Sequence, residues 1–337
     1  MKSCWRPVVS EARAMVTSGA PASRNGFQRY TLTELLHMTF PEPCWLVDGL
    51  LPAGLTVFAG KSKVGKSFML LQLARCIGAG EPFLGLATEQ RRVLYLTLED
   101  APVRIHKRLR MQEADDDDKV EFQTQWRVGK DGILDLVTEI ESERYGLIIA
   151  DTLGRVLGAS LDPNKSEHMT LALGGLQSAA INHNVVLMDI DHHSSKPSFK
   201  MDESDPIADI MGATAKGAVA DCIWGLYRKR NDPGATLKAL GRDVPETELA
   251  LQFSGGDTCL WERRGDARNT PKDKAEATIL KVLRQMGPAD AGEVGEQIKK
   301  TRSGVRRILI RMESSGIVGK TKSTTSNGAA KDLYFVL

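Results

Sequence analysis

The sequence predicts an α/β protein, with a mostly parallel, twisted sheet flanked by helices and a small helical domain after it. Three observations carry this prediction. A glycine-rich loop at 60–67 stands between an apolar run and a helical pattern, and further apolar runs alternate with amphipathic segments up to about residue 227. A polar, turn-rich stretch at 265–271 then precedes three more helical patterns. Strands that alternate with helices favour right-handed crossovers, and hence a parallel sheet with helices on both faces.

The expected elements follow in chain order from their hydrophobic patterns. Apolar runs predict strands at 55–59, 92–98, 120–126, 146–150, 185–190 and 221–227. Helical patterns fill the intervals, at 68–74, 100–112, 132–143, 167–182 and 213–220. Asp100 precedes Pro102 at the start of the second of these helices and is expected to be its N-cap. Antiparallel edge strands are then expected at 236–240, 248–253 and 259–263.

Bulk composition argues against a membrane or secreted protein. The 337 residues are 42% hydrophobic, which supports a real core, yet no apolar run approaches the length of a membrane span. Residues 1–28 lack the apolar centre of a signal peptide and are rich in small residues and Arg, so we expect a disordered segment. The five cysteines are widely spaced, which disfavours disulfides and zinc ribbons. These features predict a reduced, cytoplasmic protein with no membrane partner.

Charge is unevenly divided along the chain. Residues 271–337 hold 13 Lys and Arg against 7 Asp and Glu, a net charge of +6. The remainder holds 32 against 36, a net charge of −4. We therefore expect a large domain at 29–265, a linker at 266–271 and a basic domain at 272–337 that meets a polyanion.

The basic domain has the pattern of a winged helix-turn-helix. Helical segments at 272–286, 290–300 and 303–314 precede two strand-like segments that flank a polar stretch. Three helices and a hairpin wing form a DNA-binding variant of the helix-turn-helix. The expected DNA contacts come from the third helix and the wing: Arg302, Arg306, Arg307, Lys320 and Lys322. Two alternatives stay open. Arg306 and Arg307 could pair with Glu293 or Glu296, and a winged helix can serve purely as a protein-interaction module.

Residues 60–67 form a complete phosphate-binding loop, G-x-x-x-x-G-K-[ST]. Its members are Gly60, Lys61, Ser62, Lys63, Val64, Gly65, Lys66 and Ser67, followed by Phe68. The motif requires a strand before it and a helix after it, and both are predicted. Consecutive backbone N–H groups and the helix N-terminus attract phosphate. Lys66 is expected to reach the β- and γ-phosphates, and Ser67 to hold Mg²⁺. The motif therefore predicts ATP and Mg²⁺ as ligands.

Further candidates follow predicted strands at the sheet edge where α/β proteins bind ligands. Asp151 fits the acid that reaches Mg²⁺ through water, although an Asp at this position can also serve a turn. Glu99 can orient or deprotonate the attacking water, or be an exposed residue near a helix start. His193 could hydrogen-bond the γ-phosphate, with His192 as the other candidate and a structural histidine as the alternative.

Five segments follow one another in a characteristic order: the phosphate loop, Leu98-Glu99-Asp100, Ile148-Ile149-Ala150-Asp151-Thr152, His192-His193-Ser194-Ser195-Lys196 and Gly212-Ala213-Thr214-Ala215. This order resembles that of RecA-like ATPases over about residues 30–264. The histidine-containing segment resembles the RepA-like branch, which is related to DnaB-type hexameric helicases and is common on plasmids, phages and mobile elements.

The resemblance implies a RecA-like P-loop core that hydrolyses ATP at subunit interfaces, in a homo-oligomer that is often a hexameric ring. The neighbouring subunit would donate an arginine finger, for which Arg242 is the candidate and Lys238 a companion. The rival candidate for the finger is the basic cluster at 228–230. Alternatively, Arg242 could simply be a charged residue at the tip of a hairpin. Segments 153–167 and 194–211 would face a channel that holds single-stranded DNA.

The resulting functional hypothesis is a ring-forming helicase or translocase in the replication of a mobile element, plasmid or phage. The competing hypothesis is an ATP-switched DNA-binding regulator or loader without motor activity. The rate of ATP hydrolysis with and without single-stranded DNA separates the two.

Overall fold

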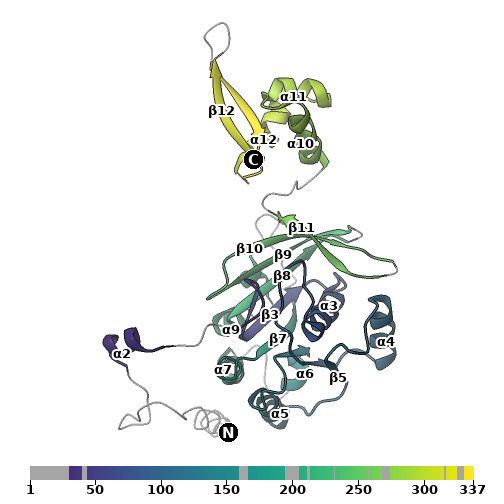
Figure 1. The fold of residues 1–337 in the computed structure, drawn as a ribbon, viewed down its shortest axis with the longest axis vertical. Helices are drawn as coiled ribbons and strands as arrows, with labels where there is room; N and C mark the ends of the chain where they lie inside the picture. Colours follow the sequence, from purple (N-terminus) through teal and green to yellow (C-terminus); the bar gives the residue numbers. More distant parts are fainter. Residues whose placement is uncertain are drawn as a thin grey trace. The chain divides into compact units, whose positions relative to one another are not determined.

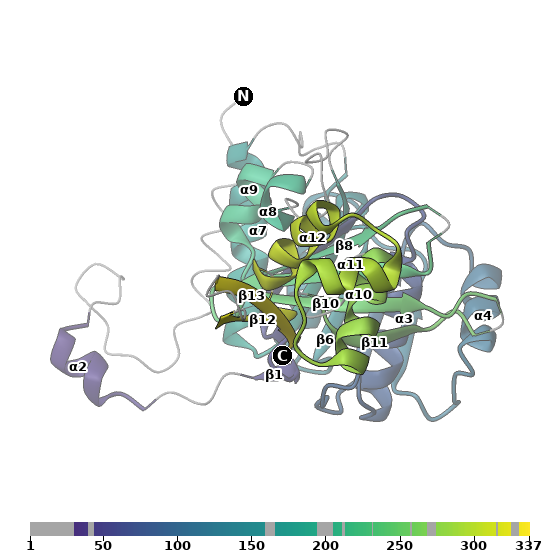
Figure 2. The ribbon, with the colours of Figure 1, turned by 90° about the horizontal axis from the view of Figure 1, so that it is seen from above.

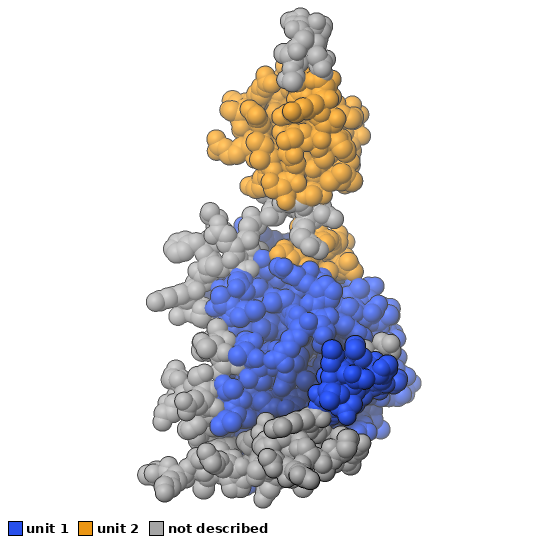
Figure 3. All heavy atoms as spheres, turned by 90° about the vertical axis from the view of Figure 1, so that its left-hand side faces the viewer, with its two compact units in different colours: residues 1–247, 253–262 blue, residues 248–252, 263–337 orange. Residues whose placement is uncertain are grey.

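The computed structural model describes residues 30–39, 44–158, 166–193, 205–210, 213–230, 232–256, 258–267, 274–314, 316–324 and 330–337. The segment 1–28, predicted to be disordered, lies outside these residues, as do parts of both predicted channel segments. The chain divides into two compact units (Figure 3). One comprises residues 1–247 and 253–262, and the other comprises residues 248–252 and 263–337.

The larger unit is built on one sheet (Figure 1). Its parallel strands are β3 (Gly54–Gly60), β4 (Val93–Thr97), β5 (Val120–Gln123), β6 (Leu147–Asp151), β7 (Val186–His192) and β8 (Cys222–Arg228). Strand β9 (Gly234–Gly241) runs antiparallel to β8. Strands β10 (Thr247–Phe253) and β11 (Trp261–Asp266) extend the sheet, whose order is β11-β10-β9-β8-β3-β7-β6-β4-β5.

Helices cover both faces of the sheet. They are α3 (Lys66–Ala79), α4 (Pro102–Met111), α5 (Lys130–Glu141), α6 (Leu153–Leu157), α7 (Ser166–Asn182), α8 (Pro206–Asp209) and α9 (Ala213–Val219). Figures 1 and 2 place α7 and α9 on one side and α3 and α4 on the other. All residues of β3, β4 and β6 are buried, as expected for parallel strands covered on both faces. The predicted fold class, a mostly parallel sheet flanked by helices, is confirmed.

The core on one face joins sheet and helices. Leu94, Ile148 and Leu187 from three neighbouring strands pack with Leu136 of α5 and Leu176 of α7. Before β3, the chain forms the helix α2 (Leu32–His37) and a small antiparallel pair, β1 (Trp45–Val47) and β2 (Leu51–Pro52). Among the described residues, no helix is both long and apolar enough to cross a membrane.

The prediction that Asp100 caps α4 is wrong. The N-cap residue is Ala101, which makes no side-chain capping bond. Asp100 instead accepts hydrogen bonds from Arg104 and Arg108, one and two turns into the helix. Charge-assisted bonds to guanidinium are stronger than a bond to a neutral backbone N–H, so the arginines take the carboxylate.

The smaller unit contains the three helices and the hairpin that its sequence predicts. They are α10 (Lys274–Met286), α11 (Ala291–Ile298), α12 (Arg302–Ser314), β12 (Val318–Thr324) and β13 (Ala330–Val336). The two strands are antiparallel, and Ala289 forms a bridge to Tyr334 of β13. Ile279, Val294 and Leu309, one from each helix, are fully buried in its core. Its identification as a winged helix stays a prediction.

Candidate active site

The phosphate loop joins β3 to α3 in a conformation that requires its glycine. Gly65 has a φ of 106°, which is in the left-handed region. A Cβ atom at this position would also lie 2.8 Å from Cζ2 of Trp261. Lys61, Ser62 and Lys63 are exposed at the tip of the loop, Val64 is buried, and Ser67 and Phe68 are half-buried at the start of α3. The loop therefore leaves its N-terminal half open to solvent and shields its C-terminal half.

Lys66 points back into the loop. Its Nζ atom donates hydrogen bonds to the carbonyl oxygens of Gly60 (2.6 Å) and Lys61 (3.1 Å). Burial lowers the pKa of Lys66 to about 8, and the nearby carboxylates of Asp151, Asp191 and Glu99 limit the fall. An ammonium group so poorly solvated gains strongly from a phosphate oxygen, because phosphate brings the negative charge that carbonyl groups lack.

The structure brings Asp151 and Glu99 to the edge of the sheet that carries the phosphate loop. Asp151 ends β6 and pairs in register with Thr97, and its carbonyl oxygen accepts a hydrogen bond from Leu98 (3.0 Å). Burial raises the pKa of the Asp151 carboxyl to about 7, with a further increase from Glu99 and Asp100. A divalent cation would relieve this repulsion between acids, so the Asp151 carboxylate suits Mg²⁺. Among the described residues, no group of three or more His, Cys, Asp or Glu side chains could hold a metal ion by itself.

His193 is the buried member of the histidine pair. Its ring lies 4.9 Å from that of Tyr227, and its backbone N–H donates to the carbonyl of Gly60 in the phosphate loop (3.4 Å). Burial lowers the pKa of His193 to about 4, so the imidazole is neutral at pH 7. Its Nε2 atom is buried and has no partner among the described residues. His192 is more exposed, and its backbone N–H donates to the Asp191 carboxylate. His193 is therefore the member of the pair with a buried, unpartnered ring nitrogen, next in the chain to the end of β7 and bonded through its backbone to the phosphate loop.

Four side chains beside the phosphate loop were not recognised as a group in the sequence. We call Phe68, Arg228, Phe253 and Trp261 the base-side cluster. The Arg228 guanidinium lies 4.7 Å from the ring centroid of Phe253 and 5.5 Å from that of Trp261, and it donates to the carbonyl of Val64 (3.3 Å). Trp261 Nε1 donates to the Gly65 carbonyl (3.2 Å), and Phe68 packs on Phe253. The cluster holds the C-terminal half of the loop against the late strands.

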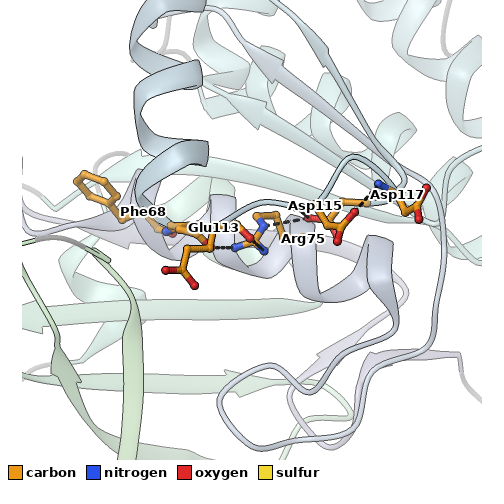
Figure 4. A network of polar contacts seen from close by, with 7 residues as sticks. Phe68, Arg75, Glu113, Asp115 and Asp117 are labelled. Atoms are coloured by element: carbon orange, nitrogen blue, oxygen red, sulfur yellow. Dashed lines mark hydrogen bonds and ion pairs between the residues drawn. The ribbon is translucent and has the colours of Figure 1, made fainter.

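A polar network fixes α4 relative to α3 (Figure 4). Arg75 on α3 donates to the Glu113 carbonyl (3.0 Å) and pairs with Asp118 (2.9 Å), beyond the end of α4. The buried Gln112 donates to the carbonyls of Phe68 (2.9 Å) and Cys259 (3.2 Å). The network therefore fixes the C-terminal end of α4 against α3.

Arg242 lies at the sheet edge opposite its own phosphate loop. It follows β9, whose last residue, Gly241, pairs with Cys222 at the start of β8. Its guanidinium is about half-exposed, pairs with Asp221 (3.2 Å) and donates to the Ala218 carbonyl (3.0 Å). Arg242 therefore lies at the opposite edge of the sheet from Lys66. Its rival Arg228 lies at the same edge as its own loop and packs on it.

The predicted DNA-contacting residues of the smaller unit differ in their availability. Arg302, Arg306, Arg307 and Lys322 are exposed, whereas Lys320 pairs with Glu313 (3.1 Å). The foreseen pairing of the arginines with Glu293 does not occur, since Lys331 takes that carboxylate (2.9 Å). Within the described part of the chain, Arg306 and Arg307 make no ion pair.

Comparisons with known proteins agree with this geometry. The fold matches a separately solved ATPase domain with a TM-score of 0.50 and 14% identity, over 62% of this chain and 84% of that chain. It also matches a DnaB-like replicative helicase, solved with its interactions with primase, with a TM-score of 0.50 and 15% identity. That match covers 62% of this chain and only 57% of the helicase chain. No curated protein matches the sequence significantly.

At these identities the matches establish the fold, a RecA-like P-loop core like that of DnaB-like helicase ATPase domains. A family model described as an AAA domain matches residues 21–198, which is more than half of the chain. The protein therefore belongs to this family of AAA-type ATPase domains.

Proposed function

We propose that this chain hydrolyses ATP as a DNA-associated, ring-forming ATPase of the RepA-like branch, and acts as a helicase or translocase in the replication of a mobile element, plasmid or phage. One observation carries the proposal. A desolvated Lys66, a buried Asp151 and a more exposed Glu99 gather at the sheet edge that carries the phosphate loop.

The residues divide the work of phosphoryl transfer. Lys66 would bind the β- and γ-phosphates, and Ser67 and Asp151 would hold Mg²⁺, which would supply positive charge to the phosphates. Glu99 accepts a proton from the attacking water. The buried, neutral His193 donates its unpartnered ring N–H to the γ-phosphate, so its contact is lost when that group leaves.

The base-side cluster supports a nucleotide over a simple phosphate ligand. Arg228 presents a planar guanidinium beside the phosphate loop, backed by the rings of Phe253 and Trp261. Planar cationic and aromatic groups stack on bases through their π faces. We assign this side of the loop to the adenine of ATP.

In a ring, each nucleotide site would receive an arginine finger from the neighbouring subunit. Arg242 stands away from its own loop and is half-exposed, which suits an arginine finger that acts on the nucleotide of a neighbour. On assembly the finger would exchange Asp221 and a backbone carbonyl for a phosphate. The hexamer is the form that the resemblance implies.

DNA is the proposed partner of both units. Single-stranded DNA would occupy the ring channel, and the winged helix would contact duplex DNA through Arg302, Arg306, Arg307 and Lys322. The separate basic unit also favours the second candidate, an ATP-switched regulator or loader, because a compact unit with exposed arginines can bind DNA without a motor.

Hydrolysis of ATP by the purified full chain, with and without single-stranded DNA, tests the proposal together with a strand-displacement assay. Stimulation and displacement support the motor. Assembly that depends on ATP, with neither effect, supports the switch. No Mg²⁺-dependent turnover in a folded protein would refute both.

A further inference from the structure

Thr97, the last residue of β4, carries a buried hydroxyl group that lacks a hydrogen bond. The residue is 5% exposed, and its Oγ1 atom has no hydrogen-bond partner among the described residues. A buried hydroxyl without a partner lowers the stability of a folded protein, so its presence calls for an explanation. One explanation is an ordered water molecule or a ligand that binds there when the protein works.

The hydroxyl of Thr97 lies beside the acid of the expected metal site. Thr97 pairs in register with Asp151 on the neighbouring parallel strand β6, so both side chains project to the same face of the sheet. Leu96 and Ala150, which precede them, face the other way and pack in the core with residues of α5 and α7. Thr97 and Asp151 therefore face the side of the sheet that α3 covers (Figures 1 and 2).

The two side chains of this pair complement each other chemically. Asp151 is 7% exposed and makes no ion pair in the described part of the chain, whereas Asp189 on the next strand has Lys216. An ionised carboxylate can only accept hydrogen bonds, and a hydroxyl can both donate and accept. A water molecule suits the pair, because it can donate one hydrogen to each side chain while its oxygen faces a cation.

We propose that Thr97 is a positioning residue whose hydroxyl holds, together with the Asp151 carboxylate, the water molecule through which Asp151 binds Mg²⁺. This inference rests on the proposed function, because it needs the nucleotide and its metal ion. Mg²⁺ keeps several of its water molecules in protein sites, so a group that orients one of them strengthens its binding. Bridging waters are nearly as favourable as direct hydrogen bonds, and here both partners are already buried and in place.

The test measures how tightly the full chain binds a fluorescent ADP analogue at increasing Mg²⁺ concentrations, and separately in EDTA. Thr97→Val keeps the shape of the side chain but lacks the hydroxyl, and Thr97→Ser keeps the hydroxyl. Thr56→Val is the matched control, since the Thr56 hydroxyl is also buried in the sheet but lies near the start of β3, away from the phosphate loop.

Thr97→Val should raise the Mg²⁺ concentration that gives half of the full increase in affinity by about three- to tenfold, the equivalent of one hydrogen bond. Its affinity in EDTA should equal that of the wild type, and its Tm without nucleotide should not fall, because the lost hydroxyl had no partner. Thr97→Ser should stay within about twofold of the wild type, and Thr56→Val should match it. If Thr97→Val does not fold, Thr97→Ala tests the same loss of the hydroxyl.

A second background separates positioning from general structure. If Thr97 acts through the water of Asp151, then Thr97→Val should not change the Mg²⁺ requirement of an Asp151→Asn protein further. An unchanged requirement for Thr97→Val in the wild-type background, an equal loss of affinity in EDTA, or a Thr97→Ser protein as impaired as Thr97→Val would overturn the inference. An equal response of Thr56→Val would also overturn it. In each of these cases Mg²⁺-dependent ATP hydrolysis by the wild type leaves the proposed function standing. If the wild type itself shows no Mg²⁺-dependent binding or turnover, the proposed function fails first and this inference with it.

Discussion

The nucleotide-free protein should become more stable when Asp151 is replaced by Asn, although hydrolysis is lost. Burial raises the pKa of this carboxyl from its ordinary 3.8 to about 7. Between these values the folded protein binds a proton that the unfolded chain has released, so stability falls as pH rises from about 4 to about 7. Above pH 7 the whole penalty is present, and an uncharged Asn avoids it.

The magnitude follows from the shift. About three pKa units correspond to about 4 kcal/mol in the free energy of unfolding. Lys66 offsets part of this gain, because Asp151 is the largest of the attractive charges that support its ammonium. We expect a net gain of about 2 kcal/mol at pH 8, which corresponds to about 4–8 °C in Tm for a domain of this size.

Thermal unfolding of wild type and Asp151→Asn at pH 5 and pH 8, without nucleotide, measures the effect. The Tm difference between the two proteins should be small at pH 5 and should reach about 4–8 °C at pH 8. Mg²⁺ with ADP should reverse the order, because ligand binding stabilises only the protein that holds the ion. Asp189→Asn is the contrasting control. Burial raises the pKa of Asp189 too, but this carboxylate faces the largely buried ammonium of Lys216 at 3.2 Å, so its removal breaks a buried ion pair and should lower Tm. A gain for Asp151→Asn that is absent, or equal at both pH values, would refute the reasoning.

Four further predictions concern the site and its partners. Lys66→Ala should abolish phosphate release and weaken binding of a fluorescent ATP analogue at least tenfold; normal turnover would remove Lys66 from the site. Glu99→Gln should bind ATP normally but hydrolyse it at least a hundredfold more slowly in single-turnover assays. Arg242→Ala should bind ATP but not hydrolyse it, and mixing with Lys66→Ala subunits should restore some hydrolysis; no recovery in mixed oligomers contradicts a role in trans. Replacing Arg306 and Arg307 by Ala should weaken DNA binding and reduce its salt dependence by about two phosphate contacts, measured by fluorescence anisotropy.

The nucleotide side of the site was predictable because its signals are local. The phosphate loop is contiguous, and Glu99 and Asp151 each follow an apolar strand. Parallel strands bring their carboxyl ends to one edge, so alternation of strands and helices was enough to place both acids beside Lys66. The same rule distinguishes Arg228 from Arg242, once the direction of β9 is known.

Contacts across long sequence separations were not predictable. Trp261 binds the carbonyl of Gly65 across 196 positions, and no residue near either one signals the pairing. Arg155 and Glu99 are 56 residues apart and meet only because β4 and β6 are neighbours in the sheet. Asp100 was misassigned because its local pattern fits a cap, whereas the competing arginines lie on the next turns of the helix.

The buried carboxylates at the edge of the sheet differ in whether a positively charged side chain pairs with them. Asp189 and Asp191 share the ammonium of Lys216, at 3.2 and 2.7 Å, and although burial opposes it, their attraction raises the pKa of Lys216 above its ordinary value. Asp189 also accepts the N–H of Leu153 (3.0 Å), so this ion-paired cluster fixes the chain just beyond Asp151. Burial raises the pKa of both Asp189 and Asp151, but Asp151 has no ion pair among the described residues. Lys216 thus neutralises part of the charge of Asp189 and Asp191, which have a structural role. Asp151, where Mg²⁺ is expected to bind, has no such partner among the described residues. Binding of Mg²⁺ and ATP would then relieve a penalty already built into the fold, which couples nucleotide affinity to the stability of this edge.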